Sequence, residues 1–207
     1  MIEFSDIERY LPQYLSKEAS ANLFAELKDF PENIDNRIYT NFLLGSPIIY
    51  QGDGFCGLLS VNLPDAKVAK VPGVILSNSC DIDKANERLS ETRLVFATIF
   101  QLEKYKNALV KTYVDTGKKT EASINGHIDR IRKQYISHIF YLPAGGNLEH
   151  ESIVFFDRVN NLPNKFVEKI GIQKHRLFTL SDYGFYLFLY KLSIHFTRIR
   201  ENVTRSG

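Results

Sequence analysis

The chain has 207 residues, of which 44% are hydrophobic and 24% are charged, and its formal net charge is +2. This length and composition are typical of one globular domain and exclude a disordered or fibrous protein. A net charge so close to zero excludes a protein that is basic overall, so a nucleic-acid partner would need a local patch of Lys and Arg.

Cysteine content and apolar runs indicate the compartment. Cys56 and Cys80 are too few for a disulfide framework, and the opening MIEFSDIERY is acidic where a signal peptide would be basic and apolar. The nearest approach to a membrane span, residues 183–190, is far shorter than the ~20 residues required. We therefore expect a cytoplasmic protein that does not enter a membrane.

The N-terminal region, residues 1–44, predicts helices. Ser5 and Ser16 are suited to cap two helices within residues 5–29, and Pro31 ends the second. Pro12 allows only an early or kinked turn in the first of them. A helical hairpin is the expected structure.

From Gly45 to Phe100 the apolar period changes to two, which predicts strands at 46–50, 55–63, 68–76 and 93–100. Pro72 lies inside the third and lacks an amide donor, so we expect an edge or a bulge there. Short strands joined by small turns favour a small barrel or a strongly bent sheet.

The second half of the chain adds a helix at 120–137, strands at 137–142 and 152–156, and a long helix at 180–202. Thr179 or Ser181 is suited to cap the long helix, with one face buried. The residues expected on that face are Phe185, Leu189, Leu192, Phe196 and Ile199. The prediction is a single α+β domain over 1–207, with a barrel core at 45–160, a helix inserted near 120–137 and the C-terminal helix within 161–207.

A segment within residues 45–102 resembles the core of the PemK/MazF family. Its features are Val71-Pro72, the strand GVILS (73–77) and the strand FATIF (96–100) with Thr98. The resemblance implies an SH3-like barrel and the RNA-cutting activity of toxin–antitoxin systems. Val71 stands where the family has its catalytic arginine, Lys70 is the only cation close by, and the Thr98 segment lacks the family's proline. The fold therefore does not imply the chemistry.

The loop SNSCDID (77–83) follows the most strand-like segment of the chain. Loops at strand ends commonly carry catalytic groups. The candidates for catalysis are Lys70, Ser77, Cys80, Asp81 and Thr98. The alternative is turn chemistry, in which Asn78 and Ser79 bond the local backbone and an aspartate caps a short helix. A thiolate at Cys80 would be disfavoured by its neighbour Asp81, so a cysteine-dependent hydrolase is a third and weaker hypothesis.

Metal and cofactor signals do not reach a recognisable pattern. Asp81, Asp83 and Glu87 lack the glycine and ligand alternation of a calcium loop, and the two cysteines lack zinc spacing. The five histidines carry no spacing that assigns one to catalysis. No metal or cofactor is predicted.

Basic residues recur at helical spacing in two places. The predicted phosphate-binding residues are Arg130, Lys133, Lys191 and Arg198, and the segment KYKNALVKTYVDTGKK (104–119) adds five lysines. The alternative is that both stripes are the solvated faces of amphipathic helices.

Two functional hypotheses follow. The favoured one is a non-catalytic binding module of a multi-component bacterial or phage system, which contacts a protein partner or a second copy through the C-terminal helix around Phe188 and Tyr190. The alternative is an RNA-binding protein or endoribonuclease of the PemK/MazF type.

Overall fold

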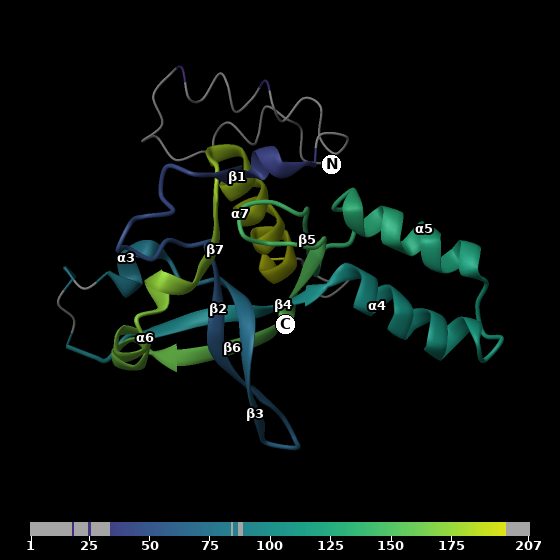
Figure 1. Ribbon diagram of the computed structural model, residues 1–207, viewed down its shortest axis with the longest axis horizontal. Helices are drawn as coiled ribbons and strands as arrows, with labels where there is room; N and C mark the ends of the chain where they lie inside the picture. The colour runs from purple at the N-terminus through teal and green to yellow at the C-terminus, as the bar shows by residue number, and fades with distance from the viewer. Residues whose placement is uncertain (1–17, 19–24, 26–33, 84, 87–88, 198–207) are drawn as a thin grey trace, which may run out of the picture. The chain divides into compact units, whose positions relative to one another are not determined.

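The computed structural model describes residues 18, 25, 34–83, 85–86 and 89–197 (Figure 1). The chain divides into two compact units, residues 1–33 and 34–207, and all the elements below belong to the second. The predicted helical hairpin at 5–29 falls outside the described residues, apart from residues 18 and 25.

A seven-stranded antiparallel sheet forms the centre of this unit, in the order β1-β7-β2-β3-β4-β6-β5. The strands are β1 (Tyr39–Thr40), β2 (Gly54–Asn62), β3 (Lys67–Ile75), β4 (Arg93–Gln101), β5 (Ile139–Leu142), β6 (Ser152–Pro163) and β7 (Arg176–Leu180). The α+β class is confirmed. The sheet is open, with β1 and β5 at its edges, so the predicted closed barrel is not confirmed.

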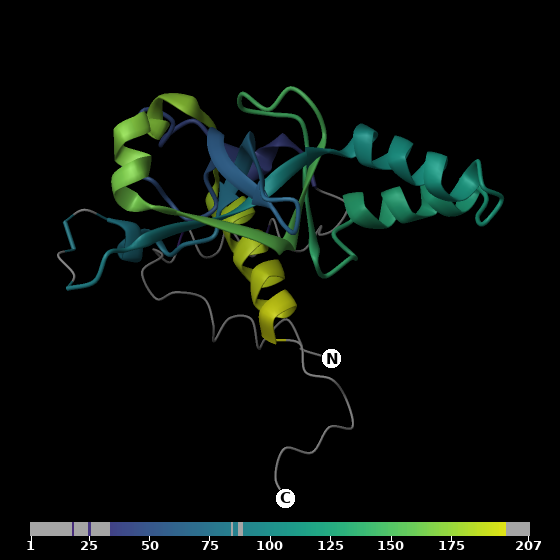
Figure 2. The ribbon, with the colours of Figure 1, turned by 90° about the horizontal axis from the view of Figure 1, so that it is seen from below.

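Five α-helices accompany the sheet in the described part of the chain: α3 (Ser79–Ile82), α4 (Leu102–Leu109), α5 (Glu121–Arg132), α6 (Asn164–Ile170) and α7 (Asp182–Thr197). Shorter turns are η2 (Asn36–Ile38), the π-helical η3 (Val110–Val114) and η4 (Ile172–His175). Helices α4 and α5 form a hairpin that projects from the sheet at the end opposite α6 (Figures 1 and 2). We call residues 102–133 the helical hairpin.

The predicted strands at 55–63, 68–76 and 93–100 are confirmed as β2, β3 and β4. Pro72 lies where the β2–β3 register shifts, because Val71 pairs with Leu58 and Gly73 with Phe55. The expected bulge at Pro72 is therefore present.

The predicted strand at 46–50 is wrong, because this segment is an irregular loop. Its polar groups bond side chains in place of a neighbouring strand. The amide of Ile48 donates to Ser46 Oγ at 3.2 Å, and the amide of Tyr50 donates to Asp53 Oδ2 at 3.0 Å. Local side-chain acceptors thus compete with sheet formation.

Strands β5 and β6 are covered on both faces. Phe140 and Phe156 pack against Phe188 of α7, with ring centroids 5.4 and 5.8 Å from that of Phe188. On the other face, Ile139 and Phe155 join the apolar cluster that includes the buried face of α5. Because side chains alternate between the two faces of a strand, the pair β5–β6 packs against α7 on one face and against α5 on the other.

The C-terminal helix, predicted at 180–202, is α7. Ser181 caps it, since Ser181 Oγ accepts from the amide of Gly184 at 3.2 Å. The predicted buried face is wrong: Phe196 is 63% exposed, and the buried residues are Tyr183, Gly184, Tyr186, Leu187, Phe188 and Lys191. The apolar helix thus finds most of its cover within this chain, although Tyr190 remains 40% exposed.

Residues 161–181 hold more structure than the sequence patterns predicted. Helix α6 and strand β7 both lie there, before α7 begins. In the described part of the chain, no helix combines the length and apolarity needed to cross a membrane.

Candidate nucleic-acid interface

The polar loop after β3 is held by its own turn chemistry. Asn78 Oδ1 accepts from the amide of Cys80 at 2.9 Å and so caps α3. Ser77 Oγ accepts from the amide of Val95 at 2.7 Å and lies 3.3 Å from the carbonyl oxygen of Arg93. The hydroxyl and amide oxygens that the sequence singled out are therefore engaged by the backbone.

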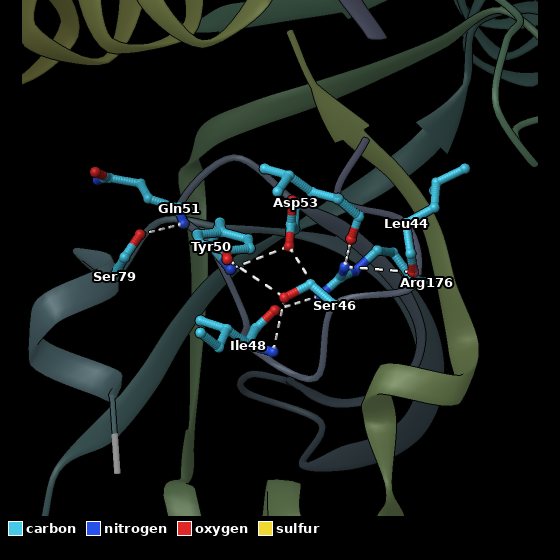
Figure 3. Close-up of polar contacts among 9 residues, drawn as sticks. Leu44, Ser46, Ile48, Tyr50, Gln51, Asp53, Ser79 and Arg176 are labelled. Atoms are coloured by element: carbon cyan, nitrogen blue, oxygen red, sulfur yellow. Dashed lines mark hydrogen bonds and ion pairs between the residues drawn. The ribbon is translucent and has the colours of Figure 1, made fainter. Parts of the chain in front are cut away.

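A second set of bonds joins this loop to the segment that precedes β2 (Figure 3). The amide of Gln51 donates to Ser79 Oγ at 3.0 Å, and Gln51 Nε2 donates to the carbonyl of Leu76 at 2.8 Å. We call the group in Figure 3 the polar corner; its side chains come from Ser46, Tyr50, Gln51, Asp53, Ser79 and Arg176.

A buried ion pair lies at the centre of the polar corner. Arg176 Nη2 is 3.4 Å from Asp53 Oδ2, and the two side chains are 2% and 1% exposed. Arg176 also donates to the carbonyls of Leu43, Leu44 and Ile48. The guanidinium thus fixes the irregular loop, and its burial leaves no surface for a ligand.

Burial raises the pKa of Asp53 to about 6, against the lowering effects of the Tyr50 amide, Arg176 and the Thr179 hydroxyl. Asp53 Oδ1 has no hydrogen-bond partner among the described residues. The Thr179 hydroxyl lies near enough to lower the pKa of Asp53, but it forms no hydrogen bond among the described residues either.

The predicted catalytic candidates lie in different environments. Lys70 is exposed on the outer part of β3, opposite Leu59. Thr98 is 6% exposed in β4, opposite Gly73. Cys80 and Asp81 are exposed on α3, and the hydroxyl of Ser77 is engaged between Val95 and Arg93. Thr98 is thus buried and Ser77 is engaged by the backbone, whereas Lys70, Cys80 and Asp81 lie at the surface on two different elements.

The helical hairpin is the most basic part of the chain. Residues 102–133 contain eight Lys or Arg and four Asp or Glu, a formal net charge of +4. Its inner face is apolar, with Ile124, Ile128 and Ile131 buried against the sheet. The charges therefore lie on the outer surface of an element that the sheet holds in place.

Arg158 stands beside the base of this hairpin on an irregular stretch of β6. Ala97 pairs with Val159 and Ile99 with Val154, so residues 155–158 are set against Thr98 alone. Such a bulge redirects side chains that a regular strand would alternate. The guanidinium carbon of Arg158 lies 4.2 Å from the ring centroid of Phe155 and 5.3 Å from that of Phe100.

Further rings continue the stack onto the hairpin. Tyr105 of α4 lies edge-on to Phe155, with centroids 5.5 Å apart, and its hydroxyl is 3.1 Å from His127 Nε2. The imidazole of His138 also stacks on Phe155, with ring centroids 6.3 Å apart. We call Phe100, Tyr105, His127, His138, Phe155 and Arg158 the basic aromatic cluster.

The cluster is electropositive. Burial lowers the pKa of His127, and the charges of Lys119, Arg130 and His138 lower it further. Lys119 Nζ also lies 5.5 Å from the ring centroid of Tyr113. Among the described residues, neither Arg158 nor Lys119 is paired with a carboxylate.

The four predicted phosphate-binding residues have different fates. Arg130 is exposed on α5 beside the cluster, and Lys133 is half-buried just after α5. Lys191 does not lie on a solvated stripe: it is 3% exposed, and Nζ donates to the carbonyls of Gln134 and Ile136 at 2.6 Å each. Arg198 lies outside the described residues.

Sequence patterns missed Tyr105, His127, His138 and Arg158 as members of one group. The available signal was Asp157-Arg158 in the strand-like run SIVFFDRV, where two charges interrupt the apolar residues. Phe155 is 5% exposed and Phe100 and Tyr105 are half-buried, so the exposed members of the cluster are Arg158 and His138. A guanidinium can bind a phosphate, and unpaired bases can stack on guanidinium or imidazole planes. No family model matches the chain, and no curated protein matches it either.

Proposed function

We propose that this protein is a binding module for single-stranded RNA and that the basic aromatic cluster is its interface. The observation that carries the proposal is the guanidinium of Arg158, which is exposed, lies over two aromatic rings and has no carboxylate partner among the described residues. Single-stranded nucleic acid is bound by cations that contact its backbone and by guanidinium or imidazole planes on which unpaired bases stack. The exposed side chains of Arg158 and His138 offer these groups.

The helical hairpin supports the proposal by its charge. Lys119 and Arg130 flank the cluster, and the hairpin's net charge of +4 exceeds that of the whole chain. Phosphate neutralisation by Lys and Arg supplies most of the non-specific affinity for nucleic acid. An acidic peptide would meet the same charge but would not need the rings, so RNA is the ligand we favour.

The curled part of the sheet, β2 to β6, is compatible with an SH3-like origin, which we include in the proposal. The hydroxyl of Ser60 and the amide of Val61 in β2 both donate to Asn160 Oδ1 of β6, at 3.2 and 3.1 Å. This contact joins strands that are not neighbours in the sheet order. It supports curling without requiring the family's RNA-cutting chemistry.

Binding to oligouridylate by fluorescence anisotropy tests the proposal. Loss of one cationic stacking contact should weaken affinity by about tenfold or more, so Arg158→Ala should bind that much more weakly than the wild type. The slope of log affinity against log salt should fall by roughly 0.7 if Arg158 contacts one phosphate. Double-stranded RNA should compete poorly, since its paired bases cannot stack on the exposed planes of Arg158 and His138.

Lys165→Ala is the matched control, because Lys165 is an exposed cation on α6, at the far end of the sheet from the hairpin (Figures 1 and 2). Equal affinities of the wild type, Arg158→Ala and the control would reject the cluster as the interface. Absence of binding at 10 mM salt, where the electrostatic screening length is ~30 Å, would reject RNA as the ligand. Shortened RNA after incubation would favour the endoribonuclease alternative.

A further inference from the structure

We infer that His127 is a further phosphate contact of this interface and that it binds RNA as the imidazolium, so that RNA binding takes up a proton. This inference rests on the proposed function and names a regulation of the same site. It concerns one residue among the six of the cluster and can fail while RNA binding itself stands.

The position of His127 leaves one ring nitrogen for a ligand. The half-buried imidazole is held through Nε2, which lies 3.1 Å from the hydroxyl of Tyr105, with ring centroids 5.9 Å apart. Nδ1 has no hydrogen-bond partner among the described residues. A histidine fixed at one nitrogen and free at the other is oriented to donate from the free one when protonated.

Four groups from different parts of the fold interact with His127. Tyr105 faces it from α4, Arg130 from its own helix α5, Lys119 from the turn between the helices, and His138 from the segment before β5. Burial lowers the pKa of His127 most, and its electrostatic interactions with Lys119, Arg130 and His138 lower it further, so the free protein favours the neutral imidazole.

A bound phosphate reverses this balance. Its negative charge offsets Lys119, Arg130 and His138, and the imidazolium gains an acceptor at Nδ1, so the pKa of His127 rises on binding. By linkage, affinity then increases as pH falls through the window between the bound and the free pKa. The affinity gain is about tenfold for each unit by which RNA raises that pKa.

Isothermal titration calorimetry with 5′-hydroxyl oligouridylate tests the inference on the wild-type protein, because this ligand keeps a constant charge between pH 5.5 and pH 8. Titrations at pH 6.5 in two buffers of different ionisation enthalpy give the number of protons taken up. A positive number that approaches one, with affinity rising at least about tenfold from pH 8 to pH 5.5, is the expected result. Binding with no proton uptake would overturn the inference and leave the proposed function intact.

Two variants assign the proton to a residue. His127→Gln should lose most of the pH dependence of the affinity, whereas His138→Gln should retain most of it. The reverse pattern would overturn the assignment to His127. If His127→Gln does not fold, the imidazole signals of the wild type followed by NMR over the same pH range decide: the pKa of His127 must rise when RNA is added. No binding at any pH would reject the proposed function itself.

Discussion

Among the described residues, the acidic or basic side chains of Asp53, Arg176 and Lys191 are almost completely buried, and their partners explain how the fold accommodates them. Arg176 pairs with Asp53 and three backbone carbonyls, and Lys191 Nζ bonds two carbonyls near the end of α5. Buried charge is tolerated when it is paired or hydrogen-bonded in this way. Asp53 and Lys191 make stability depend on pH, because burial shifts the pKa of each.

Lys191 is expected to make the protein more stable at alkaline pH. Burial lowers its pKa from 10.5 to about 8, so between these values the unfolded chain binds more protons than the folded one. The free energy of unfolding of the wild type, relative to Lys191→Met, should therefore rise by about 3 kcal/mol from pH 7 to pH 10.5. Urea unfolding at both pH values measures it, with Lys165→Met, at an exposed lysine, as the control. Parallel profiles of the wild type and Lys191→Met would contradict the expectation.

Asp53 is expected to act in the opposite direction. Its pKa rises from 3.8 to about 6 in the folded protein, mainly through burial, so the folded chain binds more protons between these values. Relative to Asp53→Asn, the wild type should therefore lose about 2 kcal/mol of unfolding free energy as pH rises from 4 to 7. Urea unfolding is the suitable measurement, because guanidinium salts would screen the ion pair. A difference between the two proteins that does not change with pH would show that Asp53 keeps its ordinary pKa.

At the scale of elements, α7 is fixed by a close approach to η2. A Cβ at Gly184, in the first turn of α7, would lie 2.1 Å from the carbonyl oxygen of Ile38. Gly126 in the middle of α5 differs, because nothing lies within 4 Å of a Cβ there. One glycine is thus required by packing, whereas the other only lowers the helix propensity of α5.

These two glycines give a matched pair of variants. Gly184→Ala should lower the free energy of unfolding by about 1–3 kcal/mol or more, because the clash is with backbone and α7 must shift. Gly126→Ala should raise it by about 0.5–1 kcal/mol, since alanine favours an exposed helix. Urea unfolding followed by circular dichroism measures both. A stable Gly184→Ala would mean that α7 does not approach η2 as closely as described.

The helical hairpin is the element on which the proposed function depends. Its apolar face packs on β5 and β6, while Lys119 and Arg130 lie on its outer surface beside Tyr105 and His127. An amphipathic hairpin of this kind separates stability from ligand binding. Substitutions at the charged positions should therefore change affinity with little effect on folding.

At the scale of the whole molecule, the net charge is small, but positive and negative charge are unevenly distributed along the chain. Residues 102–133 carry a net charge of +4 and the complete chain +2, so the remaining residues carry −2. A polyanion would therefore be attracted to one end of the sheet, although the chain as a whole is nearly neutral. Because exposed charges are screened beyond ~8 Å at physiological salt, this attraction acts only near the hairpin.

Local patterns were sufficient to predict the α+β class, the strands β2, β3 and β4, the helix α5 and the bulge at Pro72. They also indicated the turn chemistry of Asn78, because a cap is formed by residues two positions apart. Such features depend on residues that are neighbours in the sequence, so they can be predicted from periodicity and residue type. The same logic failed at 46–50, where the acceptors of Asp53 and the distant donors of Arg176 replaced a strand partner.

Only the tertiary structure brought Tyr105, His127 and Arg158 together, since the register shift of β6 and the fold-back of the hairpin align residues far apart in the chain. The burial of Lys191 in the core is likewise evident only from the tertiary structure. A lysine at helical spacing indicates a solvated face, because burying an ammonium is costly, and the two carbonyls that offset this cost belong to a segment 55 and 57 residues away. Spacing along a chain reports which face a side chain occupies, whereas partners across the fold decide whether that face can be buried.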